Sequence, residues 1–131
     1  MLRITSPLSE ELEGLVHKTI GCCIDVHRAL GPGLLESIYS RAVCIELSEA
    51  GIPFEAEKHF PVMYRRHLLC HQRLDLIVDA QIVLEIKSVE HLSSVHRAQL
   101  LNYLHVSRLH VGLLLNFNVA VLQDGLKRVV L

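Results

Sequence analysis

Two neighbouring apolar runs in the middle of the chain carry charged residues in places where charge is costly. Residues 74–78 read Leu-Asp-Leu-Ile-Val, and residues 82–87 read Ile-Val-Leu-Glu-Ile-Lys. Both runs are rich in Ile, Val and Leu, so each is predicted to form a strand. If the two strands pair, Asp75, Glu85 and Lys87 meet beside a hydrophobic core. Charges in such a place need an opposite charge or a metal ion.

The first third of the chain predicts two helices. Ser9 is suited to cap the first helix, and apolar residues then recur at helical spacing as far as Leu30. The segment Gly31-Pro32-Gly33 ends this helix and starts another. The second helix is expected to end at Ala50-Gly51, where glycine suits a helix C-terminus.

The remainder predicts a sheet with one more helix. We expect strands over 54–64, 68–70, 74–78 and 82–88, a helix over 92–106, and strands over 111–117 and 126–131. A two-residue loop at Ala80-Gln81 would join the two charged strands. The strand over 111–117 is continuously apolar, which is typical of burial on both faces. An antiparallel meander followed by a helical crossover predicts an α/β fold.

Composition sets modest limits. The 131 residues suffice for one domain, which we expect to span residues 1–131, and half of them are hydrophobic. The formal net charge of −1 provides no overall attraction to nucleic acid or to an anionic membrane. No apolar run reaches the ~20 residues of a membrane helix, and residues 1–7 lack the core of a signal peptide. The four cysteines show no zinc-binding spacing, so we expect free, mostly buried thiols and a cytoplasmic protein.

The paired acids suggest a metal site. Two adjacent carboxylates repel each other, and hard oxygen ligands with open water positions suit Mg²⁺ or Mn²⁺. Such an ion polarises a phosphoryl oxygen and activates water. The backbone carbonyl of Ile86 would be a further ligand, and Lys87 would stabilise charge developing on a phosphate. Alternatively, Glu85 and Lys87 form the solvated face of a strand, with Asp75 in a cross-strand contact.

Two sets of residues at helical spacing accompany the acids. Gly33, Glu36 and Tyr39 are spaced by three and are expected to share a face of the second helix. Glu36 lies early in that helix, where the dipole favours its charge; a surface glutamate at a helix start is the alternative. The third helix presents His96, Gln99 and Tyr103 on one face. These polar residues form either a pocket against the sheet or a helix edge exposed to water.

A basic segment precedes the first acid of the pair. Arg65, Arg66 and Arg73 lie in a predicted hairpin region and are candidates for contacts to phosphates. The alternative is an ordinary solvated turn.

The motifs occur in an order that resembles a known family. The pattern Gly33-x-x-Glu36-x-x-Tyr39, followed by residues 74–78, 84–88, 98–104 and 111–117, is similar to the GxxExxY proteins. These proteins are a small branch of the PD-(D/E)xK nuclease-like superfamily. The resemblance covers nearly the whole chain and implies a restriction-endonuclease-like αβββαβ core, with a central mixed sheet flanked by helices. One departure is Leu74, where the superfamily motif has proline.

The resemblance also implies roles. Glu36, Asp75 and Glu85 would be acidic metal-binding residues, Lys87 the catalytic lysine, and Gln99 a further catalytic residue beside the site. Gly33 and Tyr39 complete the motif that names the family, as supporting residues.

The function expected from these observations is a Mg²⁺-dependent (or Mn²⁺-dependent) nuclease that hydrolyses phosphodiester bonds in nucleic acid, with DNA as the expected substrate. The first alternative is a catalytically silent module with the nuclease fold that binds nucleic acid or supports protein assembly. A more distant alternative is a hydrolase of nucleotides or other small molecules. A homodimer would place two sites across a duplex, and no membrane is expected as a partner.

Overall fold

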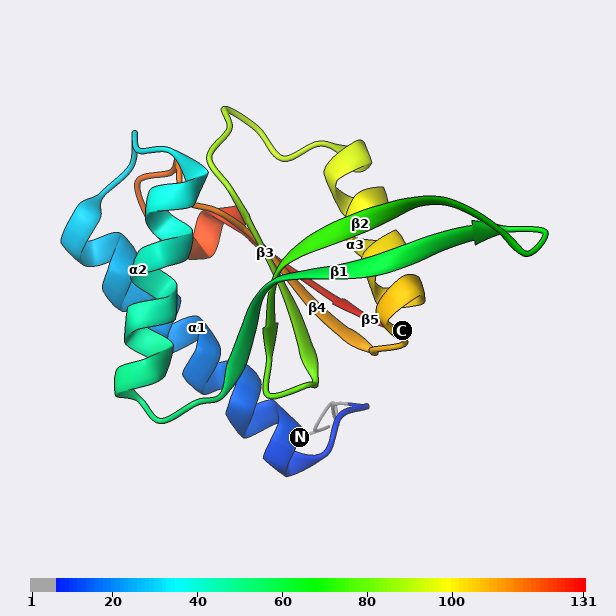
Figure 1. Ribbon diagram of the computed structural model, residues 1–131. Coiled ribbons are helices and arrows are strands. Elements are labelled where there is room, and N and C mark those ends of the chain that lie inside the picture. The colour runs from blue at the N-terminus through cyan, green and yellow to red at the C-terminus, as the bar shows by residue number, and fades with distance from the viewer. Residues whose placement is uncertain (1–6) are drawn as a thin grey trace, which may run out of the picture.

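The computed structural model describes residues 7–131, so the N-terminal segment 1–6 considered above lies outside the described residues. These residues form three α-helices and a five-stranded sheet, arranged as in Figure 1. The elements are α1 (Glu10–Leu30), α2 (Glu36–Glu49), β1 (Phe54–Tyr64), β2 (His67–Val78), β3 (Ile82–Lys87), α3 (Ser94–Ser107), β4 (Val111–Asn116), the 3₁₀ helix η1 (Leu122–Gly125) and β5 (Leu126–Val130). The expected αβββαβ order is therefore confirmed.

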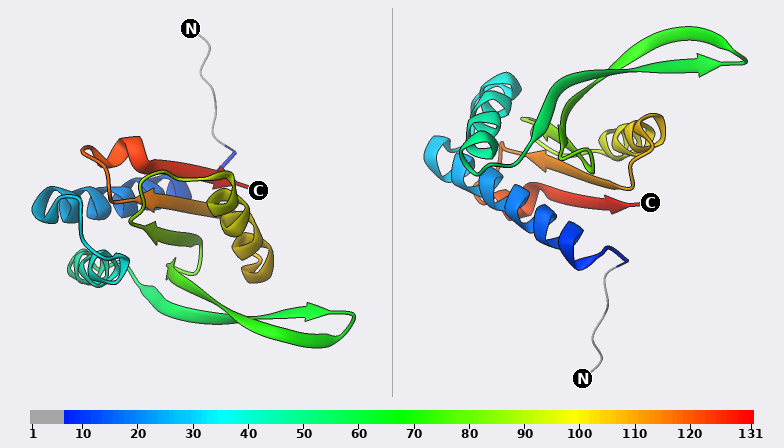
Figure 2. Two further views of the ribbon diagram at one scale, coloured as in Figure 1. Left: turned by 90° about the horizontal axis from the view of Figure 1, so that it is seen from above. Right: turned by 60° about the horizontal axis from the view of Figure 1, so that its bottom comes forward.

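The sheet is mixed. Its strand order is β1-β2-β3-β4-β5, and every neighbouring pair is antiparallel except β3 and β4. The parallel pair is connected through α3, which confirms the predicted meander and helical crossover. Helices α1 and α2 lie on one face of the sheet and α3 on the other, as the two views in Figure 2 show. Strand β4 is buried along its whole length, because both of its faces are covered.

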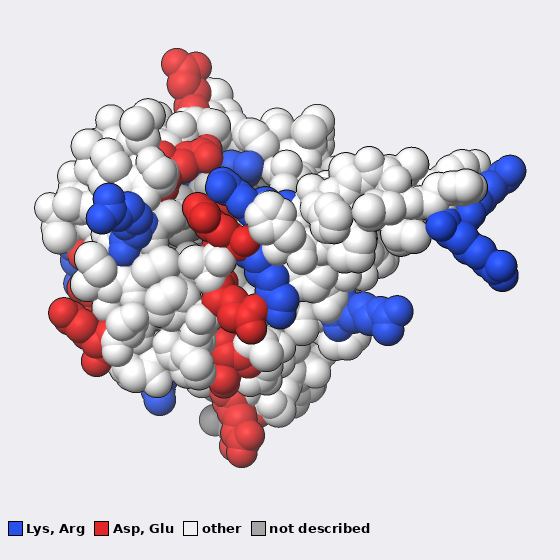
Figure 3. All heavy atoms as spheres, viewed as in Figure 1, with Lys and Arg blue, Asp and Glu red and all other residues white. Residues whose placement is uncertain are grey.

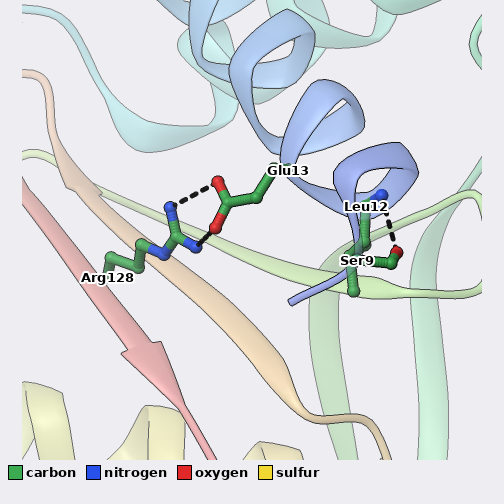
Figure 4. A network of polar contacts seen from close by, with 4 residues as sticks. All are labelled: Ser9, Leu12, Glu13 and Arg128. Carbon is green, nitrogen blue, oxygen red and sulfur yellow. Dashed lines mark hydrogen bonds and ion pairs between the residues drawn. The ribbon is translucent and has the colours of Figure 1, made fainter. Parts of the chain in front are cut away.

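Helix α1 begins where the sequence predicts. The Ser9 side chain accepts a hydrogen bond from the Leu12 N–H at 3.1 Å, and Gly31, with φ +68°, ends the helix. An ion pair between Glu13 and Arg128 connects the first turns of α1 to β5 (Figure 4). The start of α1 is thus connected to β5, the strand at one edge of the sheet.

The β1–β2 hairpin differs from its prediction. The expected short strand over 68–70 is wrong as a separate element, since these residues belong to the long strand β2. Strand β1 continues through Pro61, which an edge strand tolerates, and its register shifts only between Val62 and Met63. The β2–β3 loop has three residues, 79–81, rather than the expected two.

Most of this hairpin leaves the sheet. Strand β2 pairs with β3 only from Leu76 to Val78, whereas it pairs with β1 along nearly its full length. Beyond this point β1 and β2 continue as a two-stranded arm that projects from the rest of the molecule (Figure 1). We call residues 58–73 the arm.

Two further observations concern the expected lack of a membrane helix and the expected burial of the cysteines. Within residues 7–131, no helix is long and apolar enough to cross a membrane. All four cysteines are free, but only Cys22 and Cys23 are buried, while Cys44 is half-buried and Cys70 is exposed. The expectation that most of the thiols are buried therefore holds for only two of the four.

Candidate active site

Asp75 and Glu85 face each other where β2 separates from β3. The Asp75 carboxylate accepts a hydrogen bond from the Ile86 N–H at 3.0 Å, and the Glu85 carboxylate accepts one from the Asp75 N–H at 3.1 Å. Leu76 and Leu84 are the last paired residues before this point. Beyond this pair, the carboxylate oxygens accept the backbone N–H groups in place of the backbone carbonyls of the neighbouring strand. We call the point where β2 and β3 separate the fork, and the two acids stabilise it.

Glu85 is almost completely removed from water. Its exposed fraction is 3%, and burial, followed by the charge of Asp75, raises the pKa of the Glu85 carboxyl to about 8. The Asp75 N–H and Lys87 act in the opposite direction without overcoming these effects. Burial and the same two carboxylates raise the pKa of the Tyr103 hydroxyl to about 12. The two carboxylates therefore make the electrostatic potential at this site negative.

Lys87 lies two residues after Glu85 on β3, so the two side chains point to the same face of the sheet. Its ammonium donates a hydrogen bond to the side-chain oxygen of Gln99 on α3 at 3.0 Å, and both residues are half-buried. Glu85, Lys87 and Tyr103 thus share the face of the sheet that α3 covers. The structure thus brings Gln99 to Lys87 and places Tyr103 close enough to both carboxylates for their charges to affect its pKa.

Glu36 reaches the site from the opposite face. It is the first residue of α2, and its carboxylate accepts a hydrogen bond from the Ser88 N–H at 3.3 Å. Glu36 and Asp75 line one cavity of about 320 Å³ between α2 and the start of the arm. Within residues 7–131, however, no three His, Cys, Asp or Glu side chains are grouped closely enough to hold a metal ion. Glu36 lies across the cavity from the acid pair rather than against it.

The turn before α2 explains the other two motif positions. Gly33 precedes the helix rather than lying on its face, so that expectation is wrong, and its φ of +100° is one that glycine adopts without strain. Tyr39 is fully buried, and its hydroxyl donates to the Gly31 carbonyl at 2.5 Å and accepts from the Leu34 N–H at 3.1 Å. Its ring stacks on Phe117, with 4.6 Å between centroids. Tyr39 therefore fixes the turn that presents Glu36.

Of the other candidate residues, only Arg73 lies near the acid pair. His96 forms a capping box with Ser93 at the start of α3. Arg65 and Arg66 occupy the turn at the end of the arm, both with positive φ. Arg73 lines the cavity shared with Asp75 and forms an exposed ion pair with Glu57 at 3.4 Å.

Two supporting residues were missed by the sequence analysis. The Ser88 hydroxyl donates to the Leu34 carbonyl at 2.7 Å, which joins the end of β3 to the turn before α2. Asn116, buried at the end of β4, accepts from the Val89 N–H and donates to the Val89 carbonyl at 3.0 and 2.8 Å. Both residues stand at the ends of apolar strands, and that position is the signal that would have indicated them.

The donor set of the acid pair fits a hard divalent cation. Two carboxylates are enough for Mg²⁺, which retains several of its waters. The raised pKa of Glu85 shows that the protein alone does not compensate the paired charges. The Ile86 N–H points toward Asp75, and in an extended strand the carbonyl of the same residue points to the same edge. This carbonyl is therefore available as a third oxygen donor.

Comparison with known proteins agrees with the fold. The chain matches the family described as the PD-(D/E)XK nuclease superfamily over residues 13–129, which include both acids, Lys87 and the whole of strands β1 to β4. No significant match was found among curated proteins or among solved structures. With the match covering most of its length, the chain belongs to the PD-(D/E)XK nuclease superfamily.

Proposed function

We propose that this protein is a nuclease that uses Mg²⁺ or Mn²⁺ to hydrolyse phosphodiester bonds in nucleic acid, and that it belongs to the GxxExxY branch of its superfamily as a single domain. Superfamily membership points to nuclease activity. The observation that carries the proposal is the pair formed by the half-buried Asp75 and the buried Glu85, with Lys87 on the same side of β3 as Glu85. Such a pair is costly in a protein unless a cation binds it.

In this proposal Asp75, Glu85 and the Ile86 carbonyl would hold the cation. Glu36, which lines the same cavity as Asp75, would contribute a further carboxylate to the metal site. The cation, when bound, supplies Lewis-acid activation of water and of the scissile phosphate. Lys87 provides a positive charge toward the phosphate as negative charge develops there. The side-chain oxygen of Gln99 accepts a hydrogen bond from Lys87 and so orients the ammonium.

The remaining predicted residues support these groups. Gly33 and Tyr39 shape the turn that sets the position of Glu36, and Ser88 connects this turn to β3. Tyr103, buried on the side of α3 that faces the sheet, lies close to both carboxylates. His96 stabilises the start of the helix that carries Gln99.

A catalytically silent module is the second candidate, and one observation favours it. Both carboxylates already bond to backbone N–H groups, so the pair has a structural use at the fork. Such a protein would bind nucleic acid or a protein partner through the same fold without cleaving it.

A cleavage assay separates these candidates. Labelled single-stranded, duplex and branched DNA and RNA are incubated with the protein in Mg²⁺, Mn²⁺ or EDTA. We expect cleavage that requires the cation and is lost in Glu85→Gln and Lys87→Ala, and that persists in Lys127→Ala, which removes an exposed lysine on β5. Binding without cleavage in every metal would establish the silent module instead. Cleavage of free nucleotides alone would indicate the small-molecule hydrolase.

A further inference from the structure

The arm carries a concentrated positive charge on an otherwise acidic protein. Residues 58–73 contain four Lys or Arg residues and no Asp or Glu, which gives a formal charge of +4. The other 115 residues contain nine Lys or Arg and fourteen Asp or Glu, which gives −5. At the base of the arm, Lys58 and Arg73 form ion pairs with Glu55 and Glu57, so the positive charge of the arm is concentrated at Arg65 and Arg66 in its turn. A polyanion would be attracted to the arm and repelled from most of the remaining surface.

The shape of the arm is that of a narrow two-stranded ribbon. Its turn holds Arg65 and Arg66, and Figure 3 shows basic side chains at its free end. The arm has little core of its own, because large apolar side chains near the turn are exposed: Met63, Tyr64, Leu68 and Leu69. An isolated hairpin of this kind is only marginally stable in water. A ligand that covers it would therefore explain both its charge and its exposed surface.

The base of the arm opens into the candidate active site. Arg73, the last cationic residue of the arm, lines the same cavity as Asp75 and Glu36. A phosphate backbone that follows the arm from Arg65 and Arg66 toward the sheet would therefore reach the cavity that Asp75 lines. Arg73 thus connects the arm to the cavity of the candidate site.

We propose that the arm is the element that binds the nucleic-acid substrate, and that it selects B-form DNA by entering the major groove. The major groove of B-form DNA is about 12 Å wide and admits a two-stranded β-ribbon. The major groove of A-form RNA is deep and narrow and does not admit it. The inference deepens the proposed function and rests on it for the identity of the substrate.

A second copy of the chain is a weaker candidate than nucleic acid for the partner that binds the arm. Two arms that paired with each other would bring two formal charges of +4 together, and such like charges repel. Nucleic acid, in contrast, supplies the opposite charge to Arg65 and Arg66 in the turn. The observations therefore favour the polyanion.

The test measures binding in EDTA, so that it does not depend on cleavage. Fluorescence anisotropy is recorded with a labelled 20-base-pair DNA duplex and with an RNA duplex of the same sequence, at several salt concentrations. We expect tighter binding to DNA, and a loss of about tenfold or more in affinity in the double variant Arg65→Ala/Arg66→Ala. The salt dependence of log K should fall by about 2 in this variant, because two phosphate contacts are removed.

A matched control removes two exposed cations from α1, in Lys18→Ala/Arg28→Ala, and should bind DNA like the wild type. Equal affinity of the arm variant and the wild type would overturn the inference, and so would tighter binding to RNA than to DNA. An arm variant that changes the sedimentation coefficient but not DNA affinity would assign the arm to a second copy of the chain, again against the inference.

Different experimental results would contradict the role of the arm and the proposed nuclease function. Arm-dependent DNA binding without metal-dependent cleavage would leave the inference standing and reject the nuclease. Metal-dependent cleavage with unchanged kcat/KM in the arm variant would keep the nuclease and reject the arm.

Discussion

Asp75 and Glu85 each accept a hydrogen bond from backbone N–H groups at the fork: Asp75 from Ile86, and Glu85 from Asp75 itself. Each carboxylate uses one oxygen for this bond. The same side chains therefore separate the arm from the sheet and provide the oxygens proposed to bind a cation. Any change in their charge is expected to affect both the stability of the fork and the binding of metal.

The stability of the metal-free protein should depend on the ionisation of Glu85. The pKa of this carboxyl is about 8 in the folded protein, against 4.5 ordinarily. Between these two values the folded protein retains a proton that the unfolded chain has lost, so stability falls as pH rises from about 4.5 to about 8. Glu85→Gln should lack this fall, which amounts to up to about 5 kcal/mol for these two pKa values, and should be more stable than the wild type at pH 9.

Chemical denaturation in EDTA at pH 5, 7 and 9 measures this effect. Glu90→Gln, which neutralises an exposed carboxylate after β3, is the matched control and should behave like the wild type. A Glu85→Gln variant whose stability declines with pH as steeply as that of the wild type would refute the assignment of the raised pKa to Glu85.

Divalent cations should stabilise the folded protein through the acid pair. A cation at 100 times its Kd contributes about 2.7 kcal/mol to the free energy of unfolding, because it binds only the folded state. Thermal unfolding with increasing Mn²⁺ should therefore raise the Tm of the wild type, and much less that of Asp75→Asn or Glu85→Gln. Asp79→Asn, in the exposed β2–β3 loop, should retain the full shift. The same shift in all four proteins would show that the ion binds elsewhere.

Tyr39 should contribute to stability through its hydroxyl. In Tyr39→Phe the Gly31 carbonyl and the Leu34 N–H lose their partner, while the stacking on Phe117 is preserved. Loss of a buried hydrogen-bond partner typically costs about 1–3 kcal/mol. Urea unfolding should detect this loss, together with reduced cleavage, because the turn also positions Glu36. Tyr64→Phe removes an exposed hydroxyl on the arm and should unfold like the wild type.

Gln99 should act on cleavage by positioning Lys87. Gln99→Ala removes the oxygen that accepts the hydrogen bond from the ammonium at 3.0 Å. We expect kcat to fall roughly ten- to a hundredfold, as misplacement of a catalytic group does, with KM nearly unchanged. Gln99→Asn, with a shorter reach, should recover little, whereas His105→Ala, which changes an exposed residue on the same helix, should have no effect. A rise in KM alone would assign Gln99 to substrate binding.

Local patterns predicted most of the elements, and the exceptions have physical reasons. The helix start at Ser9 and the buried strand β4 follow from a cap and from apolar content, which act over a few residues. The continuity of β2 through residues 68–70 was missed, because its pairing with β1 rather than its own apolar content extends it. Helix α2 begins at Glu36 and not at Gly33, since the turn before it is held by Tyr39 from within the helix.

The sequence by itself determined that Asp75, Glu85 and Lys87 lie on adjacent strands, because alternation along a strand and a short connection between strands are local properties. Only the tertiary structure decided that β2 forks away at these acids, that Glu36 stays across a cavity from them, and that Glu85 is buried deeply enough to raise its pKa to about 8. These features depend on how α2 and α3 dock on opposite faces of the sheet. The free energy of that docking is spread over two cores of side chains far apart in the sequence, so no single segment encodes it.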